Sequence, residues 1–271
     1  MSQLPEEIEQ YRDRKWHREE SLRVDSAKEV EAMVENLGFC LGLTDERKRM
    51  PSVYIAVCGR RDAHMPRNVQ KDPEASRAWI LKDEVVARGK VYYAKLVKGH
   101  SMFLAPRMIP VFNALWGCSR KGESGILSKD AQKVLKVLRK EWEMATSDLR
   151  EACGFKDKKD LTRAIDELQR RMKVVPQEVV YAPKFTYIWT PAEARFPAEM
   201  RVKMPRDEAV KELARTYLQM AGMTLVGELS GKFGLPRWES GKANQELVDE
   251  KFAERLDRGV YMVPGRFTAV S

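Results

Sequence analysis

The 271-residue chain lacks most of the local signatures that identify an enzyme from sequence. Its only three histidines are His17, His64 and His100, and none belongs to a metal-binding or nucleophile–base motif. No GxxxxGK[ST] or GxGxxG segment is present, which excludes the Gly-rich loops that cradle nucleotide phosphates. Gly122-Glu123-Ser124-Gly125 has the wrong spacing for a nucleophile elbow. The sequence therefore gives no sign of a bound metal or cofactor, and we expect none.

Cysteines are also scarce. Cys40, Cys58, Cys118 and Cys153 are widely spaced and form no CxxC pair, so we expect buried thiols in place of a disulfide framework or a zinc site. No apolar run approaches the roughly 20 residues that cross a bilayer. The first twenty residues are highly charged and contain no apolar core of a signal peptide. These features predict a cytoplasmic, nucleoid-associated protein, with a monomer favoured.

Basic residues are abundant and unevenly distributed. The chain has 49 Lys and Arg against 40 Asp and Glu, a net charge of +9. The segment 119–173 holds 15 basic and 10 acidic residues, so 15 − 10 = +5 of that excess lies in one fifth of the chain. This bias favours a polyanionic partner and places its contacts on that segment.

The segment Ile126–Trp189 has the order of a winged helix-turn-helix, which is three helices followed by a β-hairpin. Ser128 and Asp157 are suited to begin the first and third helices, and Gly154 to end the second. The predicted buried stripes are Ala131, Val134, Leu135, Leu138 and Trp142 in the first helix, and Leu161, Ala164, Ile165, Leu168 and Met172 in the third. Strands are expected over Lys173–Tyr181 and Phe185–Trp189.

The third helix has a basic outward face, as expected for a recognition helix in a DNA major groove. Its candidate DNA-facing residues are Lys158, Lys159, Thr162, Arg163, Gln169 and Arg170. Lys184 in the wing and a basic loop with Arg60, Arg61 and Arg67 would add backbone contacts. Two alternatives stay open: the helix face is merely solvated and crossed by an Asp166–Arg170 pair, and the loop is merely a solvated basic loop.

The remaining chain repeats a similar order of elements. Before the central segment we expect an N-terminal helix over Leu4–Glu20 anchored by Ile8, Tyr11 and Trp16; a helix capped by Ser26; a strand over Phe39–Thr44; helices over Pro51–Cys58 and from Pro73; a strand over Arg88–Val97; a broken helix over Ala105–Trp116; and a linker over Ser119–Gly125. After it we expect a connector over Thr190–Pro205; helices capped by Asp207, over Thr224–Phe233 and over Pro236–Lys251; and a hairpin over Phe252–Ala269.

The predicted fold class is a helix-rich α+β protein of tandem winged-helix modules, 1–118, 119–198 and 199–271, forming a concave basic channel.

Several segments resemble a known family. These are ILSKDAQKVLKVL, DLREACGF and LTRAIDELQRRMKVV in the centre, and LGFC, AVCGRR, DPEASRAWILKDE and VYYAKL before it. Together they resemble the AlkZ/YcaQ group of bacterial DNA glycosylases, most closely its shorter AlkZ-related members. The resemblance implies winged-helix modules around duplex DNA and excision of alkylated or crosslinked bases without a metal.

The family's catalytic pair has no counterpart in this sequence. The resemblance implies a Gln-x-Gln or Gln-x-Asp pair after the first capped helix, where this chain has Leu37–Leu43 without Gln, Asp or Glu. Cys40 and Gly42 cannot orient or deprotonate a water in the same way. The leading hypothesis is therefore duplex DNA binding. The alternatives are a glycosylase using Asp45, Asp62, His64, Asp83 or Glu84, and a transcriptional regulator.

Overall fold

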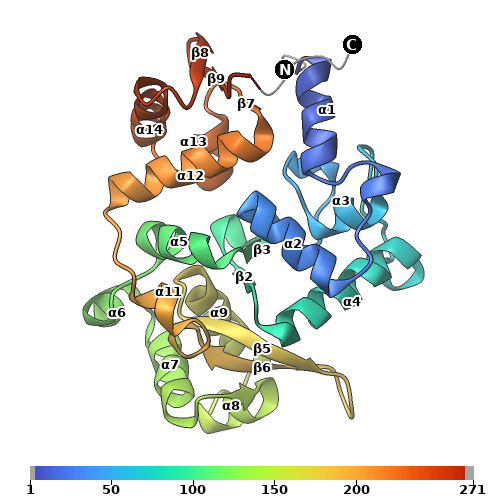
Figure 1. Cartoon of the computed structure of the whole chain (residues 1–271). Helices are drawn as coiled ribbons and strands as arrows, with labels where there is room; N and C mark the ends of the chain where they lie inside the picture. Colours follow the sequence, from blue (N-terminus) through green and yellow to red (C-terminus); the bar gives the residue numbers. More distant parts are fainter. Residues whose placement is uncertain (1–3, 266–271) are drawn as a thin grey trace. The chain divides into compact units, whose positions relative to one another are not determined.

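The computed structural model describes residues 4–265, which form two compact units. Unit 1 consists of the described residues within Met1–Asp25, Leu43–Ala78 and Pro205–Ser271. Unit 2 consists of Ser26–Gly42 and Trp79–Met204. Each unit is built from helices around small antiparallel sheets, so the chain is a helix-rich α+β protein (Figure 1).

The helices run in order along the whole described chain. They are α1 (Glu6–Lys15), α2 (Ala27–Leu37), α3 (Val53–Cys58), α4 (Pro73–Arg88), α5 (Ile109–Trp116), α6 (Glu123–Ile126), α7 (Lys129–Glu141), α8 (Thr146–Ala152), α9 (Lys158–Arg170), α10 (Ala192–Arg195), α11 (Pro197–Arg201), α12 (Arg206–Ala221), α13 (Glu228–Phe233) and α14 (Arg237–Asp249).

Three sheets share one topology. In each sheet, the third strand in sequence lies between the first and the second, and all pairs are antiparallel. The strand orders are β1 (Phe39–Leu41)-β3 (Ser101–Leu104)-β2 (Tyr92–Lys95), β4 (Met144–Ala145)-β6 (Thr186–Pro191)-β5 (Val174–Val180), and β7 (Met223–Thr224)-β9 (Val260–Met262)-β8 (Glu254–Asp257). A short first strand and a returning hairpin therefore recur along the chain.

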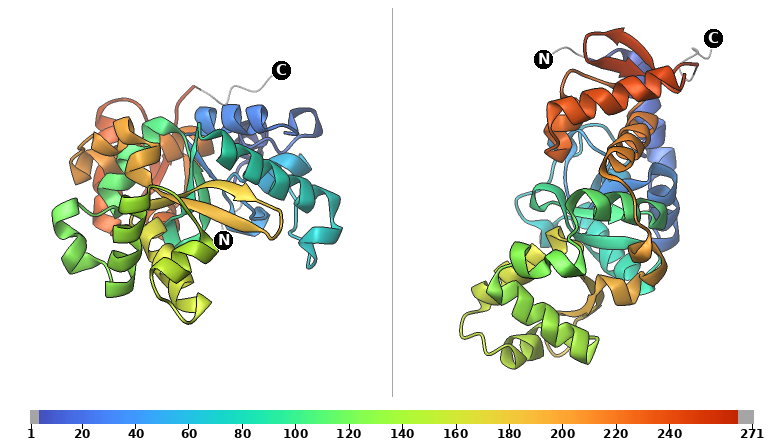
Figure 2. Two further views of the ribbon diagram at one scale, coloured as in Figure 1. Left: turned by 90° about the horizontal axis from the view of Figure 1, so that it is seen from below. Right: turned by 90° about the vertical axis from the view of Figure 1, so that its left-hand side faces the viewer.

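Helices α7, α8 and α9 and the β5–β6 hairpin confirm the elements expected in the central segment. The Ser128 hydroxyl accepts a hydrogen bond from Ala131 N and so caps α7. The Asp157 carboxylate accepts one from Lys159 N and so caps α9. Gly154 has a φ of +63°, which a glycine adopts without a Cβ clash. The hairpin is a long two-stranded ribbon (Figure 2).

The core of this segment follows the predicted stripes, with one exception. Leu135, Leu138, Leu161 and Leu168 are all at most 2% exposed and pack in one cluster. The prediction that Trp142 is buried is wrong, because its side chain is 62% exposed. Helix α7 ends at Glu141, so the 100° periodicity no longer fixes the direction of the next side chain.

The predicted linker Ser119–Gly125 is wrong as well. Helix α6 begins inside it, and the Glu123 carboxylate is buried against two cations. Its oxygens lie 2.6 Å from Arg139 Nη1 and 2.8 Å from Lys173 Nζ. Burial by itself raises the pKa of Glu123, but these two partners outweigh it and the net pKa is lowered. Glu123 thus belongs to a buried ion-pair network, whereas Ser119, Arg120, Lys121, Ser124 and Gly125 are exposed.

The N-terminal helix is anchored as expected within unit 1. Ile8, Tyr11 and Trp16 are buried, and Trp16 Nε1 donates to the carbonyl of Met220 in α12 at 2.8 Å. The predicted capping by Ser26 is confirmed, since its hydroxyl accepts from Glu29 N. The expected strand after it is confirmed but is only three residues long.

The C-terminal segment differs in detail from the prediction. Helix α12 begins at Arg206 after Pro205, with no side-chain cap, so Asp207 lies inside its first turn. The helix expected from Thr224 begins at Glu228, because Met223 and Thr224 form strand β7. Strands β8 and β9 form the predicted hairpin, whose expected end at 266–269 lies outside the described residues.

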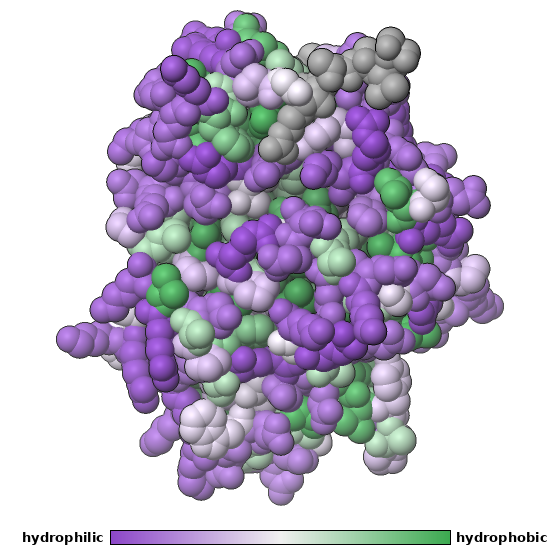
Figure 3. Space-filling view, viewed as in Figure 1, coloured by the Kyte–Doolittle hydropathy of each residue, from purple (hydrophilic) through white to green (hydrophobic). Residues whose placement is uncertain are grey.

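All four cysteines are free and buried, as predicted. Among the described residues, no helix is long and apolar enough to cross a membrane. Hydrophilic side chains cover most of the face shown in Figure 3, and apolar ones gather only in small groups.

Candidate functional site

Helix α9 presents cations on two different faces. Its apolar side is buried in the core, and Lys158, Lys159, Thr162, Arg163 and Arg170 are exposed. Lys158 and Thr162 line a pocket between α9 and the β5–β6 hairpin. Lys159, Arg163 and Arg170 lie about 100° further round the helix and do not line it. The predicted DNA-facing set therefore divides into a pocket-facing group and an outer group.

Gln169 does not lie on the exposed face as predicted. It is only 3% exposed, because α9 packs against β2 at this point. Its Oε1 accepts a hydrogen bond of 2.9 Å from Lys95 N. The alternative Asp166–Arg170 pair is also not formed, since Asp166 Oδ1 lies 2.9 Å from Lys95 Nζ. Both side chains are engaged by β2, which the helix sequence alone does not indicate.

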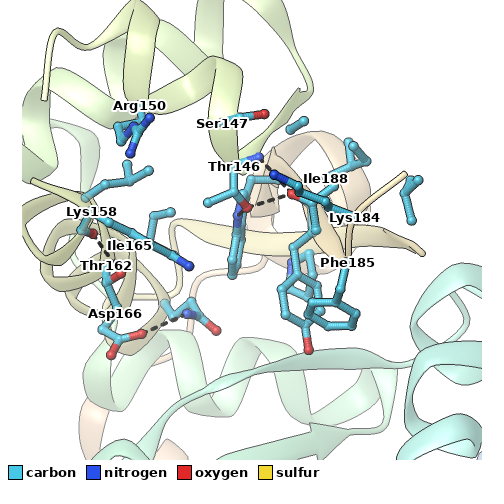
Figure 4. Close-up of a pocket in the computed structure, with 18 of the residues that line it drawn as sticks. Thr146, Ser147, Arg150, Lys158, Thr162, Ile165, Asp166, Lys184, Phe185 and Ile188 are labelled. Atoms are coloured by element: carbon cyan, nitrogen blue, oxygen red, sulfur yellow. Dashed lines mark hydrogen bonds between the residues drawn. The ribbon is translucent and has the colours of Figure 1, made fainter. Parts of the chain in front are cut away.

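The pocket lies entirely within unit 2 and has a volume of about 830 Å³. Figure 4 shows Lys158 and Thr162 on α9, Thr146, Ser147 and Arg150 on α8, and Lys184 and Phe185 on the hairpin, around this space. Arg150, Lys158 and Lys184 are exposed cations from three separate elements. Within residues 4–265, none of the three forms an ion pair. Their charge is therefore available to an anionic ligand.

The hairpin is joined to α4 by a buried polar cluster. Lys82 and Asp83 are 2% and 5% exposed, and Lys82 Nζ lies 2.6 Å from Asp83 Oδ1. Lys82 Nζ also donates to the Tyr187 hydroxyl at 2.7 Å, and the Tyr181 hydroxyl donates to Asp83. Trp79 lies beneath the ammonium, with its ring centroid 4.2 Å from Nζ. The signal in the sequence is that Lys82, four residues after Ala78, falls on the apolar side of α4 with Leu81 and Val85.

Burial raises the pKa values of the tyrosines around this cluster. Desolvation is the main cause at Tyr187 and Tyr181, and the charge of Asp83 adds to it. Burial also raises the pKa of Tyr93 to about 12, against the opposing effect of Lys82. Tyr93 and Tyr187 line the pocket. Both phenols therefore remain protonated at neutral pH and serve as hydrogen-bond donors or acceptors.

The basic loop of unit 1 is largely neutralised within that unit. Arg60 makes two 2.6 Å hydrogen bonds to the Glu74 carboxylate. Arg61 pairs with Asp13 and Glu6, whose carboxylates face its guanidinium. Arg67 is exposed. Two of the three arginines predicted to contact the DNA backbone thus have intramolecular partners, which weakens their expected attraction for phosphate.

The alternative acid–base candidates belong to two different units of the chain. Asp83 and Glu84 lie in unit 2, whereas Asp45, Asp62 and His64 lie in unit 1. The Arg47 guanidinium lowers the pKa of Asp45 by hydrogen bonding. Asp83 accepts a hydrogen bond from the Tyr181 hydroxyl and is linked through Lys82 to Tyr187.

The Leu37–Leu43 segment adjoins the pocket wall. Gly42 N donates to the carbonyl of Ser101, and a Cβ at position 42 would lie 3.7 Å from Tyr93 Cε2. Ser101 and Tyr93 both line the pocket. Cys40 is fully buried, and burial raises the pKa of its thiol. The one Gln-x-Asp sequence in the chain, Gln70-Lys71-Asp72, lies before a different helix, and its Asp72 caps α4 by accepting from Ala75 N at 2.8 Å.

Comparison with known proteins identifies the family. The sequence model of the AlkZ-related family matches residues 24–221, well over half of the chain. The solved structure of the Streptomyces sahachiroi DNA glycosylase AlkZ is similar in fold, with a TM-score of 0.59 and 12% sequence identity. That similarity covers 97% of this chain and 71% of the other. No curated protein matches the sequence significantly. The family match confirms the resemblance noted in the sequence, and the chain belongs to the AlkZ-related family.

Proposed function

We propose that this protein binds duplex DNA through the cations around the unit 2 pocket. The observation that carries the proposal is the convergence of Arg150, Lys158 and Lys184 from three elements on one concave site. Phosphate contacts of this kind position a protein on a duplex without reading its sequence. The AlkZ similarity adds weight, because the matched structure is that of a DNA glycosylase.

We further propose that α7–α9 with β5–β6 form a winged helix-turn-helix, within three modules at 1–118, 119–198 and 199–271. The support is the recurring sheet order, one sheet in each range. A second pocket has equivalent positions in the C-terminal range. Its helix contributes Arg237, Ser240, Gly241 and Asn244, at the same spacing as Lys158, Leu161, Thr162 and Ile165 in α9.

The proposed contacts fall into two groups that experiment can separate. The first group is Lys158, Thr162 and Lys184 at the pocket, together with Arg150. The second is Lys159, Arg163 and Arg170 on the outer face, with Arg67 in unit 1. Arg163 has one intramolecular partner, Asp160, at 2.9 Å, but its side chain is 79% exposed. We place the principal interface at the first group, because all its cations face one concavity.

The test is duplex binding at several salt concentrations. Lys158→Ala plus Lys184→Ala is expected to weaken binding and to reduce the log–log salt slope by about 0.9 for each phosphate that the variant no longer neutralises. Arg163→Ala plus Arg170→Ala removes the same charge from the outer face. Lys136→Ala plus Lys140→Ala, on exposed positions of α7, is the matched control. If all three variants lower affinity equally, the binding is general electrostatic attraction and the pocket interface is wrong.

A second candidate function is base excision from alkylated or crosslinked DNA. The observation in its favour is that Asp83 is coupled through Lys82 to Tyr187 in the pocket wall, beside the segment that lacks the family's Gln pair. Incubation with alkylated duplex, followed by detection of abasic sites, tests it. Release that persists unchanged in Asp83→Asn would contradict the role of this cluster.

A further inference from the structure

The interior of the unit 2 pocket differs chemically from its rim. Four aromatic side chains follow one another along the hairpin: Tyr181, Phe185, Tyr187 and Trp189. Successive ring centroids are 5.7, 5.4 and 5.3 Å apart. Phe185, Tyr187 and Trp189 line the pocket. Phe185, which Figure 4 shows at this wall, is 46% exposed. An exposed aromatic face beside a cavity is suited to stack on a planar ring.

Tyr187 provides a polarised hydroxyl at this wall. Its oxygen accepts the hydrogen bond from Lys82, whose ammonium is also paired with Asp83. A phenol oxygen that accepts from a cation becomes a stronger donor through its own hydrogen. The phenol is protonated at neutral pH, so a ligand whose ring nitrogen or carbonyl oxygen reaches this hydroxyl accepts its hydrogen bond.

The opposite wall carries fixed hydrogen-bonding groups. Lys95, Asp166 and Gln169 are joined by bonds of 2.9 Å from Lys95 N to Gln169 Oε1 and 2.9 Å from Lys95 Nζ to Asp166 Oδ1. Gln169 Nε2 completes the set with a 3.4 Å bond to Asp166. These bonds hold the three side chains in place before any ligand arrives. Lys95 Nζ, the Asp166 carboxylate and Gln169 Nε2 each keep a further hydrogen or lone pair beyond these bonds, and such fixed groups are suited to the edge of a heteroaromatic base.

The charges that line the pocket favour a ligand with an anionic group. Four cations line it, against the single carboxylate of Asp166, which is itself paired with Lys95. Three of those cations, Arg150, Lys158 and Lys184, lie at exposed positions. A ligand that matches both the aromatic interior and the cationic rim of the pocket has a planar, hydrogen-bonding ring and an anionic group. A nucleotide has both.

We propose that this pocket holds one nucleotide, its base against Phe185 and Tyr187 and its phosphate among Arg150, Lys158 and Lys184. The inference rests on the proposed function, because it makes the nucleotide one that is extruded from the bound duplex. It also adds to that function, since duplex binding by surface cations requires no cavity. A free nucleotide shares the same chemistry, and the two sources are separable by experiment.

The experiment compares a fully matched duplex with the same duplex carrying one unpaired 2-aminopurine. Affinity is measured by fluorescence anisotropy of an end label, and base environment by 2-aminopurine emission. The 271-residue protein is expected to favour the unpaired-base duplex about tenfold and to quench its emission. Phe185→Ala is expected to abolish both effects, in keeping with the loss of one base–aromatic stack. Ile126→Ala, at an equally exposed apolar position outside the pocket, leaves both unchanged.

Tyr187→Phe tests the pocket without removing a ring. It retains stacking and loses the polarised hydroxyl, so the preference is expected to fall several-fold while matched-duplex affinity stays unchanged. Far-UV circular dichroism and thermal unfolding establish that each variant is folded. Saturable binding of deoxyadenosine monophosphate that is abolished in Phe185→Ala, without any duplex preference, would assign the site to a free nucleotide.

The failure of the inference is distinct from the failure of the proposed function. If the matched duplex binds with a strong salt dependence but the unpaired base gives no preference and no quenching, and the free nucleotide does not bind, the nucleotide site is wrong and DNA binding stands. If neither duplex binds at low salt while the free nucleotide does, the proposed function is wrong and the site stands.

Discussion

Lys82 Nζ lies 2.7 Å from the hydroxyl oxygen of Tyr187, a residue 105 positions further along the chain. Together with the bond from Tyr181 to Asp83, this contact holds the β5–β6 hairpin against α4 within unit 2. It also connects a buried charge to a side chain of the pocket wall. One contact thus links the stability of the hairpin to the chemistry of the candidate site.

Removing the Lys82 ammonium should destabilise the protein strongly. Lys82→Met leaves the Asp83 carboxylate buried without its cation, and breaking a buried pair in this way costs about 3–5 kcal/mol. We expect that loss in the free energy of unfolding, measured by urea denaturation. Lys136→Met, at an exposed position of α7, should change it by less than about 0.5 kcal/mol. A loss below about 1 kcal/mol for Lys82→Met would show that the cluster contributes little to stability.

Lys232 should make the stability of unit 1 depend on pH. Burial lowers the pKa of Lys232 from its ordinary 10.5 to about 8, although the Glu228 carboxylate, 3.7 Å from its ammonium, acts to raise it. Below about pH 8 the folded protein must carry this buried charge, which opposes folding. Between about pH 8 and 10 the folded state releases the proton while the unfolded state retains it, so this contribution to stability rises with pH.

The measurement is the unfolding free energy of the wild-type protein minus that of Lys232→Met, from pH 6 to 10. The difference is expected to shift in favour of the wild type by up to about 3 kcal/mol as the pH rises. Lys242→Met, at a side chain that is 56% exposed, is the control and should give a flat difference. A flat difference for Lys232→Met would mean that its ammonium is not effectively desolvated.

Substitution by glutamine should affect stability differently at Cys40 and at Gly42, the two positions where the family's catalytic pair would lie. Cys40 is fully buried on β1, so Cys40→Gln places an amide without a partner and extra volume in the core, at a cost of about 3 kcal/mol or more. A Cβ at Gly42 meets Ser101 Cβ at 3.4 Å, an ordinary contact. Gly42→Gln is therefore expected to cost less than Cys40→Gln, because its Cβ fits without a clash even though Gly42 is itself buried. Thermal unfolding of the two variants provides the comparison, and equal losses would contradict it.

The local elements of the central segment can be predicted from the sequence alone. Ser128, Gly154 and Asp157 act within a few residues of themselves, through caps and a left-handed turn, so their roles follow from neighbouring residues alone. The buried stripe of α9 follows from helical geometry for the same reason. The family resemblance was also readable at this level, because it depends on short segments of sequence.

Which polar groups already have partners depends on tertiary contacts, and the sequence does not show these contacts. Gln169 and Asp166 are engaged by Lys95, more than seventy residues earlier in the chain, and Arg60 is neutralised by Glu74. Glu123 in the predicted linker became a buried ion-pair centre for the same reason. Periodicity defines the faces of a helix, but it does not define what packs against them. The pocket exists because β2, α9 and the hairpin meet, and that meeting depends on contacts between residues far apart in sequence.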